Sequence, residues 1–381
     1  MNDSINVSIN YNRNKISVIA EGDEITVEFD DNTYSMINKN KQDFAVWLFL
    51  PIAMRLNKNL NIIGNGSTTT IRNAVKMSEI WSMWLPSHFN RINVSFDKEI
   101  NEAYKQNIDN KTLCFYSGGI DSTYCIKDLS NKGIKPSLLT VHGMDYKTNN
   151  NESFDKFKLK TSKFAKEYGE NRFFIKTNAY SVYDKYRINL KKGHITHIFT
   201  LAACGFLFSE NFSNIIIASD YRLDQQFLVL PYGSNLATNF LFNDGQTSLI
   251  SANADITRSE KLPLLLKDNT ALECLTFCVD KKSRPNNCGI CNKCVRTKLM
   301  FLATTGEIPD IFETKEFNDN ILKSIDIKND LQRTFILDLY YATLKNNRLN
   351  LMPELVNIIK EISKPSLKYR IKKFLRPKRY L

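Results

Sequence analysis

The amino-acid sequence predicts an α/β protein, because strand-like and helix-like segments alternate through the middle of the chain. Four apolar segments have the length and composition of strands: TLCFY (112–116), SLLTVHG (137–143), RFFIKT (172–177) and NIIIAS (214–219). Helices are expected over 121–131, 153–168 and roughly 195–210. Repeated βα units predict a parallel sheet with helices on both faces, and ligands bind such sheets at the C-terminal ends of the strands. This central region is expected to span residues 109–305.

Residues 1–108 predict a small α+β domain in front of this region. The alternating stretches INVSINY, KISVIA and EITVEF are typical of a β-meander. A buried apolar helix over 43–56 is followed by the strand NLNII, a helix over 69–84 and the strand RINVSF. The turn GNGSTTT (64–70) is interpreted as a strand-to-helix turn with a Ser or Thr N-cap, and phosphate binding is the alternative. The longest apolar run, FAVWLFLPIAM, is too short to span a bilayer.

Residues 306–381 predict a helical extension with a basic tail. Eight Lys or Arg and no acidic residue lie between Ile362 and Leu381, whereas the whole chain has a net charge of +12. The remainder carries only +4, so the total charge does not argue for a nucleic-acid partner. Leu367, Ile371 and Phe374 share one helical face among basic residues, which suits docking on an anionic membrane surface or on RNA. A solvated extension is the alternative.

The composition and the N-terminus indicate a cytoplasmic protein with a sizeable core. Hydrophobic residues make up 43% of the chain, which argues against wholesale disorder. The first residues, MNDSINVSINYN, lack the basic and apolar parts of a signal peptide. Eight cysteines in such a chain favour thiols or a metal site over a disulfide framework. We also expect a homo-oligomer.

The segment after the first central strand predicts an anion-binding loop. It reads Ser117-Gly118-Gly119-Ile120-Asp121-Ser122 and leads into the helix 121–131. Glycines permit a tight turn and close approach to a ligand, and the N–H groups of a first helical turn attract phosphate. The two serines add hydroxyl donors, and Asp121 is expected to cap the helix or to hold Mg²⁺. A glycine-rich turn that only joins strand to helix is the alternative.

This loop resembles the pyrophosphate loop of the N-type ATP pyrophosphatases, or PP-loop enzymes. Its SGGxDS pattern follows a strand and lacks the lysine of GxxxxGK[ST]. The resemblance implies an adenine-nucleotide alpha-hydrolase-like fold, in which the loop binds the pyrophosphate that leaves when a substrate oxygen attacks the α-phosphorus of ATP. It further implies that adenine lies against the end of the second strand, at Val141 and His142. An ordinary polar role for His142 is the alternative.

A second motif, FCVDKKSRPNNCGICNKCVRT (277–297), predicts a metal site. Its cysteines, spaced C-x9-C-x2-C-x2-C, are Cys278, Cys288, Cys291 and Cys294. Four thiolates complete the closed tetrahedral shell that suits zinc, and Gly289 permits the tight turn between two of them. An iron–sulfur cluster, a redox pair and buried cysteines without metal are the alternatives.

Basic residues next to these cysteines are expected to offset the negative charge of a metal-bound cluster. Lys293, Arg296 and Lys298 are expected to offset the charge of a zinc tetrathiolate. The other cysteines fall on apolar segments and are interpreted as packing residues, with Cys274 as a stand-in ligand for Cys278: Cys114, Cys125, Cys204 and Cys274.

The two motifs together resemble the 7-cyano-7-deazaguanine synthases, which use ATP and ammonia to convert a deazaguanine carboxylic acid to a nitrile. The resemblance covers roughly residues 110–305 and implies a structural zinc beside the active site. The chain departs from these enzymes in its first 108 residues, in its C-terminal extension, and around 232–235 and 257–261. Because of these departures, the resemblance implies that the protein uses ATP but does not imply a nitrile product.

Several polar residues outside the motifs are weaker candidates. The segment 254–266 predicts a helix capped by Thr257 with Glu260 at its third position. Arg258 and Lys261 on it are expected to face ATP phosphates or an acidic substrate, or else solvent. His194 and His197 begin another helix and are interpreted as structural, with His197 also a pocket candidate.

These observations predict an ATP-dependent ligase with Asp121 and Ser122 as catalytic residues. ATP would adenylate a carboxylate or amide oxygen of a small molecule or a larger acceptor. Ammonia, an amine or a thiol would then displace AMP, with Mg²⁺ and backbone amides stabilising charge. The alternatives are a PP-loop enzyme that thiolates or otherwise modifies tRNA, and a non-catalytic nucleotide-binding accessory protein.

Overall fold

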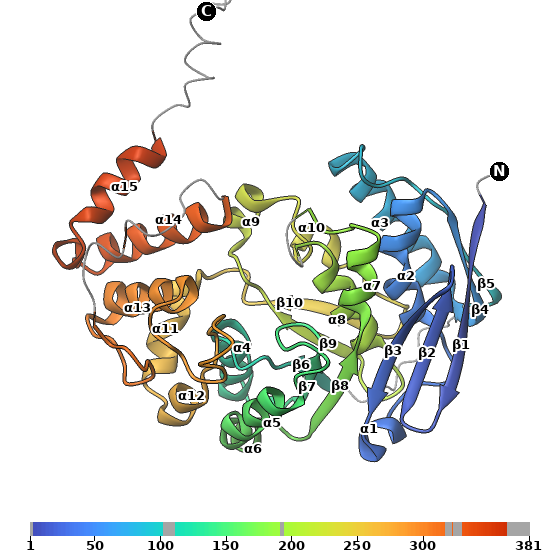
Figure 1. Cartoon of the computed structure of the whole chain (residues 1–381), viewed down its shortest axis with the longest axis horizontal. Coiled ribbons are helices and arrows are strands. Elements are labelled where there is room, and N and C mark those ends of the chain that lie inside the picture. The colour runs from blue at the N-terminus through green and yellow to red at the C-terminus, as the bar shows by residue number, and fades with distance from the viewer. Residues whose placement is uncertain (1–2, 102–110, 191–193, 317–321, 323–329, 364–381) are drawn as a thin grey trace, which may run out of the picture.

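One ten-stranded sheet runs through the N-terminal and central parts of the chain in the computed structural model (Figure 1). The structure describes all residues except 1–2, 102–110, 191–193, 317–321, 323–329 and 364–381. The strand order is β10-β9-β6-β7-β8-β3-β2-β1-β4-β5. The basic tail, with its expected membrane or RNA contacts, therefore lies outside the described residues.

The central segments form the parallel part of this sheet. The four predicted strands are β6 (Thr112–Phe115), β7 (Ser137–His142), β8 (Arg172–Thr177) and β9 (Asn214–Ala218). A fifth strand that sequence reasoning missed, β10 (Ser248–Ala252), pairs in parallel with β9. Numbered from β6, the five strands have the order 3-2-1-4-5, because β6 lies between β7 and β9. The winding thus reverses between β6 and β9, which is where open α/β sheets bind ligands.

The N-terminal strands extend the same sheet. The predicted meander is present as β1 (Ser4–Asn12), β2 (Lys15–Ala20) and β3 (Asp23–Phe29), and β4 (Asn59–Ser67) and β5 (Val94–Ile100) continue it in parallel with β1. β3 pairs antiparallel with β8, with Val27 opposite Thr177 and Phe29 opposite Ile175. The expected division near residue 108 therefore does not separate two sheets.

Helices lie on both faces of the sheet. On one face lie α2 (Asp43–Leu56), α3 (Thr68–Trp84), α7 (Ala179–Lys185) and α8 (Thr196–Phe206). On the other lie α4 (Ile120–Asn131), α5 (Asn151–Lys160), α6 (Ser162–Tyr168), α11 (Arg258–Leu266), α12 (Asn269–Cys274) and α13 (Asn292–Thr305). The helix expected over 153–168 is divided at Thr161. The connecting segments contain α1 (Asp31–Ser35), α9 (Leu223–Val229) and α10 (Leu236–Asn239). None of the described helices is long and apolar enough to cross a lipid bilayer.

Alternation of side chains along the strands divides the interior into two main cores. Leu113 and Phe115 of β6 belong to the core beneath α2 and α8, whereas Cys114 belongs to the core beneath α4 and α11. The first core contains residues from both the N-terminal and central regions. In it, Trp47 of α2 lies edge-on to Phe242, with ring centroids 4.8 Å apart. The two regions are thus joined by packing as well as by strand pairing.

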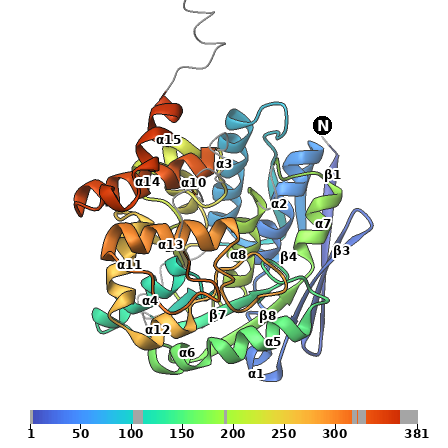
Figure 2. The ribbon, with the colours of Figure 1, turned by 60° about the vertical axis from the view of Figure 1, so that its left-hand side comes forward.

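The helical C-terminal region belongs to the second core. α14 (Asp330–Lys345) and α15 (Glu354–Ser363) are joined by the 3-10 helix η2 (Leu349–Leu351). α14 lies on α13 (Figure 2) and also packs on α11 and α9. The buried carboxylate of Asp338 on α14 accepts hydrogen bonds from the N–H and Oγ of Ser259, at 3.1 and 2.5 Å. The extension is therefore tied to the first turn of α11.

The turn 64–70 is a strand-to-helix connection, as interpreted. Ser67 is the N-cap of α3 and accepts from Thr69 N at 3.0 Å. Asp43 Oδ1 accepts from Ser67 N at 3.0 Å, and the buried carboxylate of Asp244 lies close to that of Asp43. Two buried carboxylates at this turn disfavour a phosphate, because like charges repel in a poorly solvated site.

This carboxylate pair predicts a pH-dependent contribution to stability. Burial and the neighbouring Asp244 raise the pKa of Asp43 to about 6. A raised pKa means that the folded chain holds the proton more tightly than the unfolded chain, so stability falls as pH rises from about 4 to above 6. Relative to Asp43→Asn, the natural protein should lose roughly 3 kcal/mol of unfolding free energy over this range. Urea unfolding of both proteins at several pH values measures the difference, and parallel profiles would contradict the prediction.

Candidate functional site

The loop 117–122 lies at the C-terminal edge of the sheet, where the winding reverses. β6 ends at Phe115, and α4 begins at Ile120 with Gly119 as its N-cap residue. The Oγ atoms of Ser117 and Ser122 are 3.1 Å apart, and Ser122 Oγ donates to Gly119 O at 3.2 Å. In the part of the chain that the structure describes, no protein acceptor meets the N–H groups of Ile120 and Asp121. The serines thus close the loop while backbone donors stay available.

The two glycines of the loop have different roles. Gly118 has φ +70°, and an added Cβ would lie 2.5 Å from Thr276 Cγ2. Its carbonyl also accepts from Thr276 N at 2.8 Å. Gly119 has an ordinary φ of −77°, and its Cβ would meet only Ser117 Oγ, at 3.3 Å. The backbone conformation and the packing of the loop therefore require a glycine at position 118, whereas the space beside Gly119 is open to a ligand.

Asp121 binds two cationic side chains instead of capping the helix. Lys261 Nζ lies 2.8 Å from Asp121 Oδ1, and Arg258 Nη2 forms a close ion pair with Oδ2. Burial alone would raise the pKa of Asp121, but the charges of Arg258 and Lys261 outweigh it and hold the pKa below its ordinary value. The helix cap expected of Asp121 was wrong, because Gly119 occupies the N-cap position.

Both cations come from the first turn of α11, which begins as predicted. Thr257 is its N-cap and forms a capping box with Glu260. The Lys261 side chain is fully buried and that of Arg258 is 12% exposed, so a solvated helix face was the wrong interpretation. Both residues lie beside the loop 117–122 through their ion pairs with Asp121, and their facing ATP phosphates or an acidic substrate stays a prediction.

The end of β9 completes this polar cluster. Ser219 O accepts from Lys261 Nζ at 2.7 Å, and Asp220 Oδ1 lies 3.4 Å from Arg258 Nη2. Asp220 Oδ2 accepts from Tyr232 Oη at 2.6 Å. Sequence reasoning missed Asp220, although its position directly after a predicted parallel strand was a usable signal. The cluster thus joins the ends of β6 and β9 across the switch point.

The four cysteines of the second motif, Cys278, Cys288, Cys291 and Cys294, come together as a tetrahedral metal site requires. Their sulfur atoms all lie within 4.8 Å of one another, with Cys278–Cys291 at 3.8 Å and Cys288–Cys294 at 3.9 Å. A tetrahedral site with metal–sulfur bonds of about 2.3 Å needs sulfurs about 3.8 Å apart. These residues therefore form a four-cysteine cluster that fits a metal ion such as zinc.

Backbone geometry holds this four-cysteine cluster in place. Gly289 has φ +81°, and any Cβ there would collide with Thr314 O. The N–H groups of Ile290 and Cys291 point at Cys288 Sγ, at 3.4 and 3.3 Å. Cys291 is the N-cap of α13, and a hydrogen bond from Cys294 lowers the pKa of the Cys291 thiol to about 4. The hydrogen bond with Cys291 raises the pKa of Cys294, and burial raises that of Cys278, so of these three thiols Cys291 is the one held as the thiolate, the metal-binding form.

The four-cysteine cluster adjoins the loop 117–122. Thr276, two residues before Cys278, donates to Gly118 O. Arg284 Nε donates to Cys278 O at 2.6 Å, and its Nη1 donates to Asp145 O in the loop after β7. The segment that leads into the cluster therefore lies over the ends of β6 and β7.

Of the three cations expected around the cysteines, Lys298 lies near them and Arg296 does not. Lys298 is buried near Cys288 and Cys294, as expected. Arg296 lies elsewhere: its guanidinium is 3.6 Å from the ring centroid of Phe335 on α14, in the neighbourhood of Arg258. The expectation for Arg296 was therefore wrong, because α13 directs residues 294 and 296 to different sides.

The remaining cysteines are buried free thiols in the two cores: Cys114, Cys125, Cys204 and Cys274. Their interpretation as packing residues is confirmed, and the four-cysteine cluster does not include Cys274.

The two predicted adenine contacts, Val141 and His142, lie on β7, and the His142 side chain is packed against another aromatic ring. The His142 ring stacks on Phe154 with centroids 4.1 Å apart, and its Nε2 lies 2.8 Å from Lys147 O. Burial lowers the pKa of His142. Val141 is partly buried against the first core. Adenine binding at Val141 and His142 stays a prediction.

The two other histidines considered as candidates, His194 and His197, have structural surroundings. His194 Nε2 lies 2.6 Å from Pro231 O, and the His197 ring packs on Tyr232 at 5.0 Å. Both histidine rings contact Tyr232, and the Tyr232 hydroxyl binds Asp220. The two histidines therefore adjoin the cluster around Asp220 through Tyr232.

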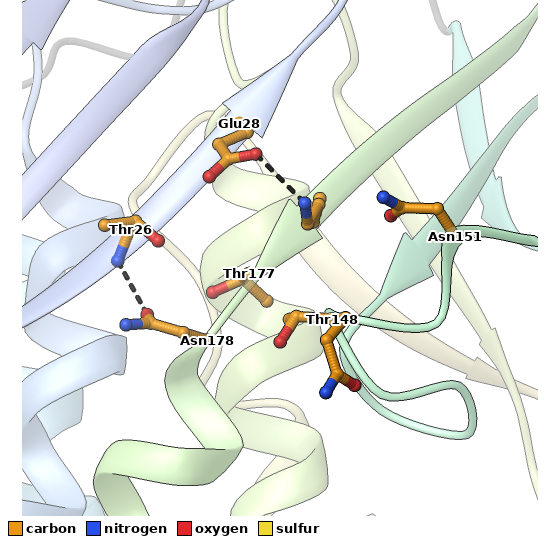
Figure 3. Close-up of a pocket in the computed structure, with 8 residues that line it drawn as sticks. Thr26, Glu28, Thr148, Asn151, Thr177 and Asn178 are labelled. Carbon is orange, nitrogen blue, oxygen red and sulfur yellow. Dashed lines mark hydrogen bonds and ion pairs between the residues drawn. The ribbon is translucent and has the colours of Figure 1, made fainter. Parts of the chain in front are cut away.

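A polar pocket of 480 Å³ lies where the N-terminal strands meet the parallel strands (Figure 3). Its lining comes from β3, from the end of β8 with the residue after it, and from the loop after β7 with the first residue of α5: Thr26, Glu28, Thr148, Asn149, Asn151, Lys176, Thr177 and Asn178. Glu28 and Lys176 form an ion pair at 3.5 Å across it, and Thr26 N donates to Asn178 Oδ1 at 2.7 Å. The N-terminal region therefore supplies one wall of a hollow at the sheet edge.

Comparisons of the chain with protein-family models, curated proteins and solved structures found no match.

Proposed function

We propose that the protein is a PP-loop ATP pyrophosphatase of the ligase type, with an adenine-nucleotide alpha-hydrolase-like central fold. The observation that carries this proposal is the SGGIDS loop at the switch point, with open backbone donors beside Arg258 and Lys261. The strand order 3-2-1-4-5 supports the same fold. The four-cysteine cluster beside the loop supports the likeness to the 7-cyano-7-deazaguanine synthases.

In this proposal the loop binds the phosphates of ATP and the pyrophosphate that leaves. The N–H groups of Ile120 and Asp121 and the hydroxyl of Ser117 donate hydrogen bonds to phosphate oxygens. Arg258 and Lys261 offset the negative charge, and Asp121 positions both. The attack of the substrate oxygen on the α-phosphorus then gives an adenylate, and ammonia, an amine or a thiol displaces AMP.

Mg²⁺ would reduce repulsion between the phosphates. Two carboxylates lie at the site, and the side chain of Asp220 is 35% exposed against 13% for Asp121, which two cations already bind. Asp220 is therefore the better placed to hold Mg²⁺ with its water ligands. Zinc in the four-cysteine cluster would fix the segment 276–294 against the loop and take no part in the reaction.

The acceptor would bind at the same sheet edge. β8, which forms one wall of the pocket, lies two strands from β6 and its loop, about 10 Å by strand spacing. Its amide, hydroxyl and charged groups suit a polar acceptor, and residues of the N-terminal region would select it. The described residues contain no observation that favours the tRNA-modifying alternative.

The products of ATP cleavage test this function. The full chain is incubated with α-labelled ATP, Mg²⁺, ammonia and a low-molecular-weight cell extract. AMP is expected, because cleavage lies between the α and β phosphorus atoms and the loop lacks a GK[ST] lysine for γ-phosphoryl transfer. Formation of ADP would overturn the mechanism. Binding of ATP without AMP formation would favour the accessory-protein alternative.

A further inference from the structure

Arg296 presents a buried positive charge beside the candidate phosphate site. The residue is on α13, two positions after Cys294, and is 6% exposed. Its guanidinium lies 3.6 Å from the ring centroid of Phe335, and that of Arg258 lies 4.7 Å from the same centroid. Two guanidinium groups thus share one aromatic ring of α14.

The two arginines differ in their partners. Arg258 has carboxylate partners in Asp121 and Asp220. Arg296 Nη1 donates to the neutral Gln332 Oε1 at 3.3 Å, and its enclosed Nε has no acceptor. Within the described ranges, no carboxylate lies at ion-pair distance from Arg296. Asp121 and Asp220 attract Arg296 only from beyond ion-pair distance, and both already bind Arg258. A buried charge that is poorly compensated is destabilising, and the like charge of Arg258 adds to the cost.

The location of this charge indicates what compensates it. α11, which carries Arg258 and Lys261, packs against both α4 and α13. The open donors of the loop 117–122 are on the first turn of α4. A planar guanidinium binds phosphate oxygens through two parallel hydrogen bonds, and stacking on an aromatic ring orients it for this.

We propose that Arg296 is an anion-binding residue of the same site, which takes the phosphate groups of ATP and the leaving pyrophosphate together with the loop 117–122. The inference rests on the proposed function for the identity of the anion. It assigns α14 a direct role, because Phe335 orients Arg296 and Arg258 from the C-terminal extension. It also makes α13 a physical link between the four-cysteine cluster and the bound phosphates.

The probe for this proposal is inorganic pyrophosphate, titrated calorimetrically into the full-length, metal-loaded protein. Arg296→Met keeps the length and packing of the side chain and removes its charge. Its dissociation constant for pyrophosphate should rise at least tenfold, with metal content unchanged. Without ligand, its thermal midpoint should equal or exceed that of the natural protein, because a buried charge without an ion-pair partner is gone. Arg296→Lys should recover part of the affinity.

A second comparison separates this proposal from the proposed function. If the natural protein binds pyrophosphate, Gly119→Val does not, and Arg296→Met binds as tightly as the natural protein, the assignment of Arg296 is wrong and the loop assignment stands. If the natural protein does not bind pyrophosphate, both fail. A lower thermal midpoint in Arg296→Met with unchanged affinity would mean that the stack on Phe335 is only structural.

Discussion

Replacing Cys291 by Ser should remove one zinc ion per chain and strongly destabilise the segment around it. Serine is a poor zinc ligand, and the other three thiols would be left without the fourth member of a tetrahedral shell. Structural zinc contributes on the order of 10 kcal/mol to the folding of small sites. Losing the ion should lower the thermal midpoint by about 10 °C even if only about a third of that free energy is lost in this larger protein. Elemental analysis and thermal unfolding of freshly purified protein measure both effects.

Cys274→Ser is the matched control for this prediction. Cys274 is also a buried free thiol, but it lies outside the four-cysteine cluster. It should retain one zinc ion per chain. Natural protein that contains no metal when purified without chelators would contradict the assignment, and iron in place of zinc would support the iron–sulfur alternative. Pyrophosphate binding should weaken with metal loss, because Thr276 connects the segment to Gly118.

Replacing Gly119 by Val should abolish AMP formation while leaving the protein folded. The backbone at Gly119 is in an ordinary conformation, and its Cβ position is open except for Ser117 Oγ. A branched side chain there would occupy the space in which phosphate meets the backbone donors. We expect a fall of at least about a hundredfold in the rate of AMP formation, comparable to removing a group of oxyanion-binding donors.

Gly118→Ala provides the contrast within the same loop. At φ +70° an alanine is strained by about 1 kcal/mol, and its Cβ would collide with the side chain of Thr276. This variant should have a clearly lower thermal midpoint, whereas Gly119→Val should not. A folded Gly119→Val protein that forms AMP at the natural rate would refute the role of the loop.

The local sequence was sufficient to predict the strands β6 to β9 and the two motifs, although β10 was missed. Each strand from β6 to β9 is a short apolar run bounded by polar turns, and such a pattern determines its own conformation. The C-x2-C-x2-C spacing likewise brings three thiols together through a single turn and the start of a helix. The four-cysteine cluster was therefore predictable from the sequence. The capping box at Thr257 and Glu260 is also a local pattern.

Tertiary structure alone decided which of these elements meet. The pairing of β3 with β8 joins residues about 150 positions apart, and periodicity tells which face of each strand is buried but not which strand lies next to it. The same holds for the ion pairs of Asp121 with Arg258 and Lys261, and for the stack of Arg296 on Phe335. The sequence specifies the charge of a side chain, but the burial and the partners of that side chain depend on how distant helices pack. This packing determines whether the charge is solvated, paired or available to bind a ligand.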